Sequence, residues 1–115
     1  MSLTVGLYMD IDAGGDELED VESFDANITH NLNTMAGKAG IYFYVWRPEE
    51  LGIEVAGQMI ETLRDGVERM KKFPEYFKQF NASNGWGTYE DFVPWLEKYL
   101  EACIRYPKAK ISIWR

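Results

Sequence analysis

Apolar and polar residues alternate at both ends of the chain. Near the start, apolar residues fill every second position from Leu3 to Ile11. Near the end, Ile111 and Ile113 share one side of the stretch 108–115. A period of two is the period of side chains along a β-strand, so both stretches are predicted to be strands. We expect them to be neighbours in one sheet, which would bring the two ends of the chain together.

Between these ends, apolar residues recur at the spacing of a helix. The spacing holds from Ile28 to Ala39, from Ile53 to Met70 and from Phe92 to Cys103. Such a stripe lets one side of a helix face a core. The sequence therefore predicts three main helices, and Pro74 is placed to open a fourth, short one.

Residue types that start and stop helices mark the expected helix ends. Asp25 or Asn27 can cap the first helix, and Gly40 can end it. Thr88 and Asp91 have the spacing of a capping box at the start of the last helix. Pro94 follows so closely that it either lies in the first turn of this helix or kinks it.

The stretch 41–46, IYFYVW, allows two predictions. Its β-branched and aromatic residues favour a third strand. A helical turn that continues past Gly40 is equally consistent, because six residues are too few to show a period. With either element the expected fold class is α+β: a small antiparallel sheet of N- and C-terminal strands packed against three to four helices, in one domain over residues 1–115.

The charge is unevenly distributed along the chain. The net charge is −7, and residues 1–37 hold eight acidic residues and no lysine or arginine. This negative field repels nucleic-acid phosphates and anionic membrane surfaces. We therefore expect no nucleic-acid and no membrane partner, and we expect basic protein surfaces or cationic ligands to be the permitted ones.

Two further features bear on the cellular compartment. No run approaches the ~20 apolar residues of a membrane span, and the N-terminus lacks the pattern of a signal peptide. The expectation is a soluble, cytoplasmic protein. The single Cys103 cannot form an internal disulfide, and its place on an apolar helical stripe predicts a small core residue.

The acidic stretch DIDAGGDELED partly matches a calcium-binding loop. Asp10 and Asp12 have the spacing of the first two ligands, but Gly14 and Val21 occupy the positions of the third ligand and of the bidentate glutamate. A solvated acidic loop is the favoured interpretation. Asp10, Asp12 and Asp16 are weak metal-ligand candidates, and no metal site or cofactor is predicted.

His30 is the only histidine of the chain and lies in the segment NITHNLN. A general base or metal ligand needs partners that orient it, and the neighbouring residues offer only amides and a hydroxyl. The favoured interpretation is that Thr29, His30 and Asn31 satisfy amides of the first helical turn. The alternative is a polar pocket, built with Asn33, that holds a small ligand.

Trp86 lies between two glycines in the loop NASNGWGTYED. The pair Asn84-Gly85 is a strong turn signal, and flanking glycines suggest unusual dihedral angles or a close approach of backbone. The indole either covers the core beside the last helix, with Tyr89 packed nearby, or forms one wall of a binding site.

Arg47 lies between Trp46 and Pro48. Its guanidinium could bind the carboxylate of a ligand, but an ion pair with Glu49, Glu50 or the acidic N-terminal segment is favoured. Pro48 and the two following acids favour the start of a helix or turn. Trp46 and Arg47 are kept as candidate binding residues.

Three blocks of the sequence carry a resemblance: THNLNTMAGKAGIY, WRPEELGI and NGWGTYEDFVPWLEKYLEACIRYP. Together they resemble a family of small uncharacterised proteins found in bacteria and their phages. The likeness runs from about Ile28 to Ile111. In that family the segment that matches IYFYVW is less β-like, so the resemblance favours a helix there. It implies no catalytic role.

The motifs of common enzyme classes are missing from the sequence: it has no phosphate-binding glycine loop, zinc pattern, nucleophile elbow or helical histidine pair. We expect a non-enzymatic, acidic interaction module without catalytic residues, which binds a partner protein or small molecule. A phage origin would suit an inhibitor whose acidic face blocks a basic active site. The alternative is a small-molecule-binding protein or unusual enzyme whose site joins His30 to Trp86. The chain is expected to be a monomer, or a homodimer through the edge of its N-terminal strand.

Overall fold

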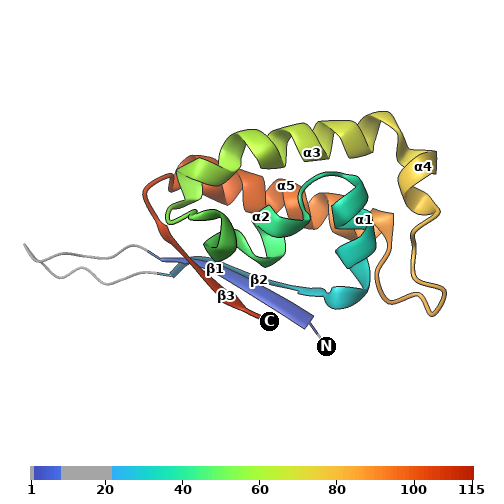
Figure 1. Cartoon of the computed structure of the whole chain (residues 1–115), viewed down its shortest axis with the longest axis horizontal. Coiled ribbons are helices and arrows are strands. Elements are labelled where there is room, and N and C mark those ends of the chain that lie inside the picture. Colours follow the sequence, from blue (N-terminus) through green and yellow to red (C-terminus); the bar gives the residue numbers. More distant parts are fainter. Residues whose placement is uncertain (1, 9–21) are drawn as a thin grey trace, which may run out of the picture.

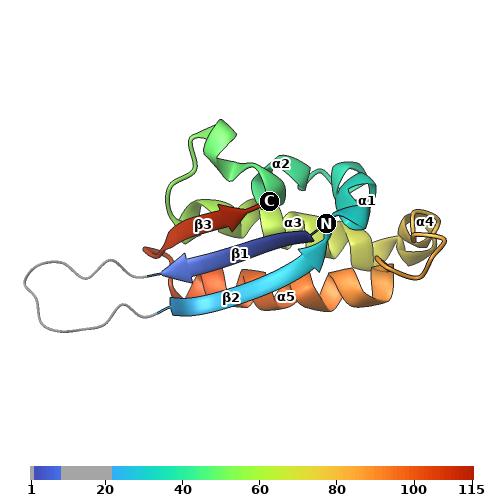
Figure 2. The same ribbon diagram turned by 90° about the horizontal axis from the view of Figure 1, so that it is seen from below.

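A three-stranded antiparallel sheet lies against a layer of helices in the computed structural model, which describes residues 2–8 and 22–115 (Figure 1). The strands are β1 (Ser2–Tyr8), β2 (Glu22–Thr29) and β3 (Lys110–Trp114), in the order β2-β1-β3. Figure 2 shows the sheet in front and the helices behind it, so one face of the sheet is covered and the other is open. The expected α+β class is confirmed.

The two terminal strands are neighbours, as their alternation predicted. Val5 of β1 faces Ile113 of β3, and both strands run antiparallel. Leu3, Val5 and Leu7 are fully buried on the helical side of the sheet. Because β1 is central and paired on both sides over Thr4–Tyr8, the expected dimer through an N-terminal strand edge is not available there. The edges of this sheet are β2 and β3.

Strand β2 corrects the predicted first helix. Residues expected to lead into a helix from Ile28, with Asp25 or Asn27 as its cap, pair instead with β1, where Leu3 faces Ile28. The true cap is Thr29, whose Oγ1 accepts a hydrogen bond from the Asn31 amide at 3.2 Å. This segment forms a strand rather than a helix because its alternate residues extend the buried face of β1 across the sheet. These residues are Phe24, Ala26 and Ile28.

After β2 the chain is mostly helical. Five α-helices follow in order: α1 (Asn33–Lys38), α2 (Tyr42–Trp46), α3 (Ile60–Lys72), α4 (Pro74–Lys78) and α5 (Tyr89–Arg105). Short 3₁₀ helices precede or link them: η1 (His30–Leu32), η2 (Pro48–Leu51) and η3 (Ala56–Met59). The longest helix, α5, packs against β2 and α3. No helix in the described part of the chain is long and apolar enough to cross a membrane.

The ends of the helices follow the predicted signals. Gly40 ends the first helical segment with φ 80°. Pro74 opens α4, and the Thr88 side chain caps α5 by accepting a hydrogen bond from the Asp91 amide at 3.2 Å. Pro94 lies inside α5, which continues beyond it to Arg105. Its place early in the helix leaves few earlier carbonyls for the ring to disturb.

The segment 41–46 is a helix rather than a strand. Val45 and Trp46 of α2 are buried, and Ile41 fits against Gly66 of α3 so closely that a Cβ atom on Gly66 would overlap Ile41 Cγ2. Packing of this kind outweighs the strand propensity of aromatic and β-branched residues. The absence of a side chain at Gly66 therefore lets α2 and α3 share one core.

We predict that Gly66→Ala destabilises the fold, because the added methyl group meets Ile41. The free energy of unfolding should fall by about 1–3 kcal/mol. The matched control is Gly37→Ala, since an added Cβ there meets no atom within 4 Å and Gly37 is exposed on α1. That variant should gain about 0.5–1 kcal/mol from helix propensity. Urea unfolding of both variants tests the prediction, which fails if they change stability alike.

Candidate functional site

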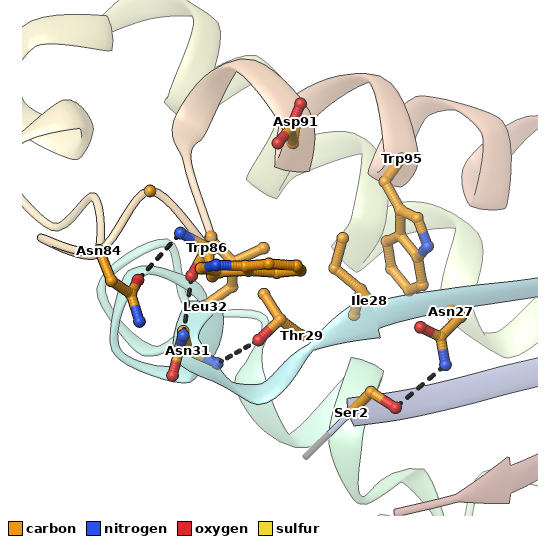
Figure 3. Close-up of a pocket in the computed structure, with 12 residues that line it drawn as sticks. Ser2, Asn27, Ile28, Thr29, Asn31, Leu32, Asn84, Trp86, Asp91 and Trp95 are labelled. Carbon is orange, nitrogen blue, oxygen red and sulfur yellow. Dashed lines mark hydrogen bonds between the residues drawn. The ribbon is translucent and has the colours of Figure 1, made fainter.

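The turn after β2 meets the loop before α5. The Asn31 side-chain amide donates a hydrogen bond to the Trp86 carbonyl oxygen at 2.8 Å, across 55 residues of chain. On the other side of the same residue, the Trp86 amide donates to Asn84 Oδ1 at 2.9 Å. The backbone of Trp86 is therefore tied from both directions (Figure 3).

The two glycines beside Trp86 explain how the loop comes so close. Gly85 and Gly87 have φ of 82° and 116°, which favours glycine. A Cβ atom on Gly87 would lie 3.0 Å from Asn31 Cβ and 3.2 Å from Thr29 Cγ2. The prediction of unusual dihedral angles or close approach is confirmed, and Gly87 shows both.

A hollow of about 680 Å³ opens between this loop, β2 and the start of α5. Trp86 and Trp95 line it together with Ile28 and Leu32, and the Trp86 side chain is 70% exposed. Figure 3 shows the Trp86 indole edge-on, with Ile28 between it and Trp95. The remaining lining residues are small or polar: Ser2, Asn27, Thr29, Asn31, Asn84, Gly85, Gly87 and Asp91. We call this the tryptophan hollow.

Among the described residues that line the tryptophan hollow, Asp91 alone is charged. Its neighbour Glu90 lies 3.5 Å from Lys78 in an ion pair. By contrast, the Asp91 carboxylate has no hydrogen-bond or ion-pair partner among the described residues. The hollow thus combines indole rings, amides and one unpaired negative charge, which disfavours anionic ligands.

His30 lies in a second hollow, of about 470 Å³, lined by His30, Asn33, Tyr42, Trp46, Arg47 and Arg115. The Trp46 indole Nε1 donates to His30 Nδ1 at 2.8 Å. Because an indole nitrogen can only donate, Nδ1 must accept, and the proton of the neutral imidazole resides on Nε2. His30 is thereby oriented by a buried core residue. We call this the arginine hollow.

Both guanidinium groups of the arginine hollow have acidic partners within the chain. Arg47 donates to Tyr42 Oη at 3.2 Å and to Glu50 at 3.0 Å. These hydrogen bonds, first to Tyr42 and then to Glu50, raise the pKa of Arg47. Arg115 pairs with Glu49 at 2.7 Å and donates to the Trp46 carbonyl oxygen at 2.9 Å. The favoured intramolecular pairing of Arg47 is confirmed.

The predicted site residues divide between the two hollows. The tryptophan hollow contains four of them: Thr29, Asn31, Asn84 and Trp86. The arginine hollow contains four others: His30, Asn33, Trp46 and Arg47. Successive residues of one turn project to different sides, so the imidazole and the Trp86 indole do not line one hollow. The convergence of the two segments was predicted correctly, but the pairing of His30 with Trp86 was not.

Two groups of candidates remain: Tyr89, and the three aspartates of the acidic segment. Tyr89 lines neither hollow, and its hydroxyl donates to the Met70 carbonyl oxygen at 3.0 Å, which agrees with a packing role. Asp10, Asp12 and Asp16 lie outside the described residues. Within residues 2–8 and 22–115, no group of three or more His, Cys, Asp or Glu side chains could hold a metal ion.

Asp91 and Trp95 are the most important site residues that sequence reasoning missed. They are four residues apart on α5, so both face the same side of the helix, next to the loop that carries Trp86. This spacing was a usable signal. Asn27 and Ile28 were hidden by the wrong helix prediction, because a strand directs them differently from a helix.

No protein-family model, curated protein or solved structure matches the chain. The resemblance to small bacterial and phage proteins therefore stays a prediction.

We predict that Gly87→Ala costs more stability than Gly85→Ala. Both variants place a methyl group at a positive φ, which costs about 1–2 kcal/mol. Only at Gly87 does the new Cβ also press on Asn31 and Thr29, since Gly85 has no atom within 4 Å of that position. Gly87→Ala should therefore lose about 1–3 kcal/mol more in urea unfolding. Equal losses would show that the loop does not pack tightly on the turn.

The pH dependence of stability tests whether the Cys103 thiol is buried. Burial raises the pKa of this thiol from its ordinary 9.0 to about 12. Above about pH 9 the unfolded thiol loses its proton while the folded one keeps it, so the free energy of unfolding falls as pH rises toward 12. Between about pH 8 and about pH 10, wild type should lose about 1.4 kcal/mol more than Cys103→Ala. Parallel losses in urea unfolding would contradict burial of the thiol.

Proposed function

We propose that the protein is a non-enzymatic interaction module that binds a partner protein through the tryptophan hollow. The observation that carries the proposal is that the Trp86 side chain is exposed while its backbone is held in place. Its side chain is 70% exposed, while hydrogen bonds from Asn31 and to Asn84 hold its backbone. A large aromatic side chain left in water on a fixed backbone is the usual form of an interface anchor.

The fixed loop lowers the cost of binding. An anchor that is mobile in the free protein must lose conformational entropy when a partner arrives. Here Gly87 packs on the turn at Thr29 and Asn31, so the path of the backbone is set beforehand. Burial of the indole surface then stabilises the complex, and little conformational entropy of the loop is lost.

The electrostatic surroundings favour a basic partner. The net charge is −7, and of the described residues that line the hollow the one with a charge is Asp91. Complementary charge speeds association and excludes acidic competitors. Together with the resemblance to bacterial and phage proteins, this supports a role in which the acidic surface covers a basic site on another protein.

A site for small-molecule chemistry has less support. That alternative joined His30 to Trp86, and the two side chains line different hollows. In the arginine hollow, Trp46 engages His30 Nδ1, and Glu50 and Glu49 pair with the two arginines. The unpaired carboxylate of Asp91 lines the tryptophan hollow instead.

We predict that Trp86→Ala abolishes capture of a partner from a lysate of the source organism. The hollow loses its main apolar surface, so affinity should fall by about 2 kcal/mol or more, about thirtyfold. The measurement is a titrated pull-down with mass spectrometry, which reports saturable binders only.

Trp114→Ala is the matched control, because Trp114 is 71% exposed but lies on β3, opposite Thr4 on the open face of the sheet. A partner that is lost with Trp86→Ala and kept with Trp114→Ala supports the proposal. Equal loss with both variants, or no saturable partner at all, argues against it.

A further inference from the structure

The carboxylate of Asp91 is placed at the hollow and is free to bind. Thr88 caps α5 through the backbone amide of Asp91, so the cap leaves the carboxylate unused. Asp91 and Trp95 lie one turn apart on the same side of α5, and both line the hollow with Trp86. Figure 3 shows Asp91 on one side of the Trp86 indole and Thr29 on the other.

The hollow has the two features that recognise an organic cation. Indole faces attract cations through the ring quadrupole, and among the aromatic side chains tryptophan does so best. A carboxylate beside the ring adds a charge-assisted hydrogen bond. Trp86 and Asp91 supply these groups, and none of the described residues that line the hollow is basic.

The class of ligand follows from the unpaired charge. An anion would be repelled by Asp91, and a neutral group that covers Asp91 would remove water from a carboxylate without replacing its hydrogen bonds. A cation avoids both costs. A guanidinium suits the site better than an ammonium because it is planar, stacks on an indole and presents several donors to one carboxylate.

We propose that the tryptophan hollow binds an arginine side chain of the partner, stacked on Trp86 and paired with Asp91. This inference rests on the proposed function, because it names the group that the partner presents. The net charge of −7 draws such a side chain toward the protein, and the exposed Trp86 receives it.

The test is a titration of the full chain with N-acetyl-arginine amide at low ionic strength, followed by ¹⁵N NMR. The indole resonance of Trp86 and the backbone amide of Asp91 should shift together and saturate. N-acetyl-citrulline amide has almost the same shape without the charge, and it should leave both resonances in place. Shifts of equal size with citrulline would overturn the proposal, because the site would then select a neutral group.

Two variants that each remove one negative charge distinguish a direct pairing with Asp91 from a general effect of the net negative charge. Asp91→Asn should weaken arginine binding about two- to fivefold. Glu90→Gln is the matched control, since Glu90 occupies the same first turn of α5 but pairs with Lys78. Equal weakening by both variants would overturn the pairing with Asp91. Thermal unfolding of each variant shows that the helix is kept.

The outcomes also separate this inference from the proposed function. If Trp86→Ala loses the partner but arginine amide does not bind, the interaction module stands and the arginine assignment is wrong. If arginine amide binds at Asp91 but Trp86→Ala keeps the partner, the cation site stands and the proposed partner surface is wrong.

Discussion

The contact between the turn after β2 and the loop before α5 is the constraint on which the candidate site depends. The hydrogen bond from Asn31 to the Trp86 carbonyl joins segments 55 residues apart, and Gly87 permits it by having no side chain. This contact places Trp86 above the end of β2 and next to the first turns of α5. Without it the loop would keep its internal hydrogen bonds, such as the one from the Ala82 amide to the Gly87 carbonyl oxygen, but would lose its tie to the turn after β2.

The same turn separates two kinds of chemistry. On one side, Trp86 and Trp95 border an unpaired carboxylate; on the other, His30 and two arginines are held by partners within the chain. Groups already paired give up existing interactions when a ligand arrives, whereas Asp91 gives up only water. Among the described residues, the tryptophan hollow therefore presents an unpaired charge, whereas both arginines of the arginine hollow are already paired with glutamates.

Local chemistry predicted much of the fold, and long-range packing decided the rest. Thr88, Pro74 and Gly40 act within one helical turn, so their roles could be predicted from neighbouring residues. Strand β2 could not be predicted in this way. Its apolar residues fit a helical spacing, and only the pairing with β1 makes it a strand. That one error assigned Asn27 and Ile28 to the start of a helix instead of to β2, although Ile28 is buried as its apolar spacing predicted. The held Trp86 was predicted from its two glycines, whereas Asp91 was assigned only to a helix cap and its free carboxylate depends on the tertiary fold.

The central claim is that Trp86 is exposed and yet rigid in the free protein. ¹⁵N relaxation of the loop measures this directly, through order parameters of the Asn84 to Gly87 amides and of the Trp86 indole N–H. Backbone order parameters of about 0.85, those of ordered secondary structure, are expected, with a slightly lower value for the indole N–H. Values below about 0.6 across these residues would contradict it, because a mobile loop would have neither a preset anchor nor a lasting hollow.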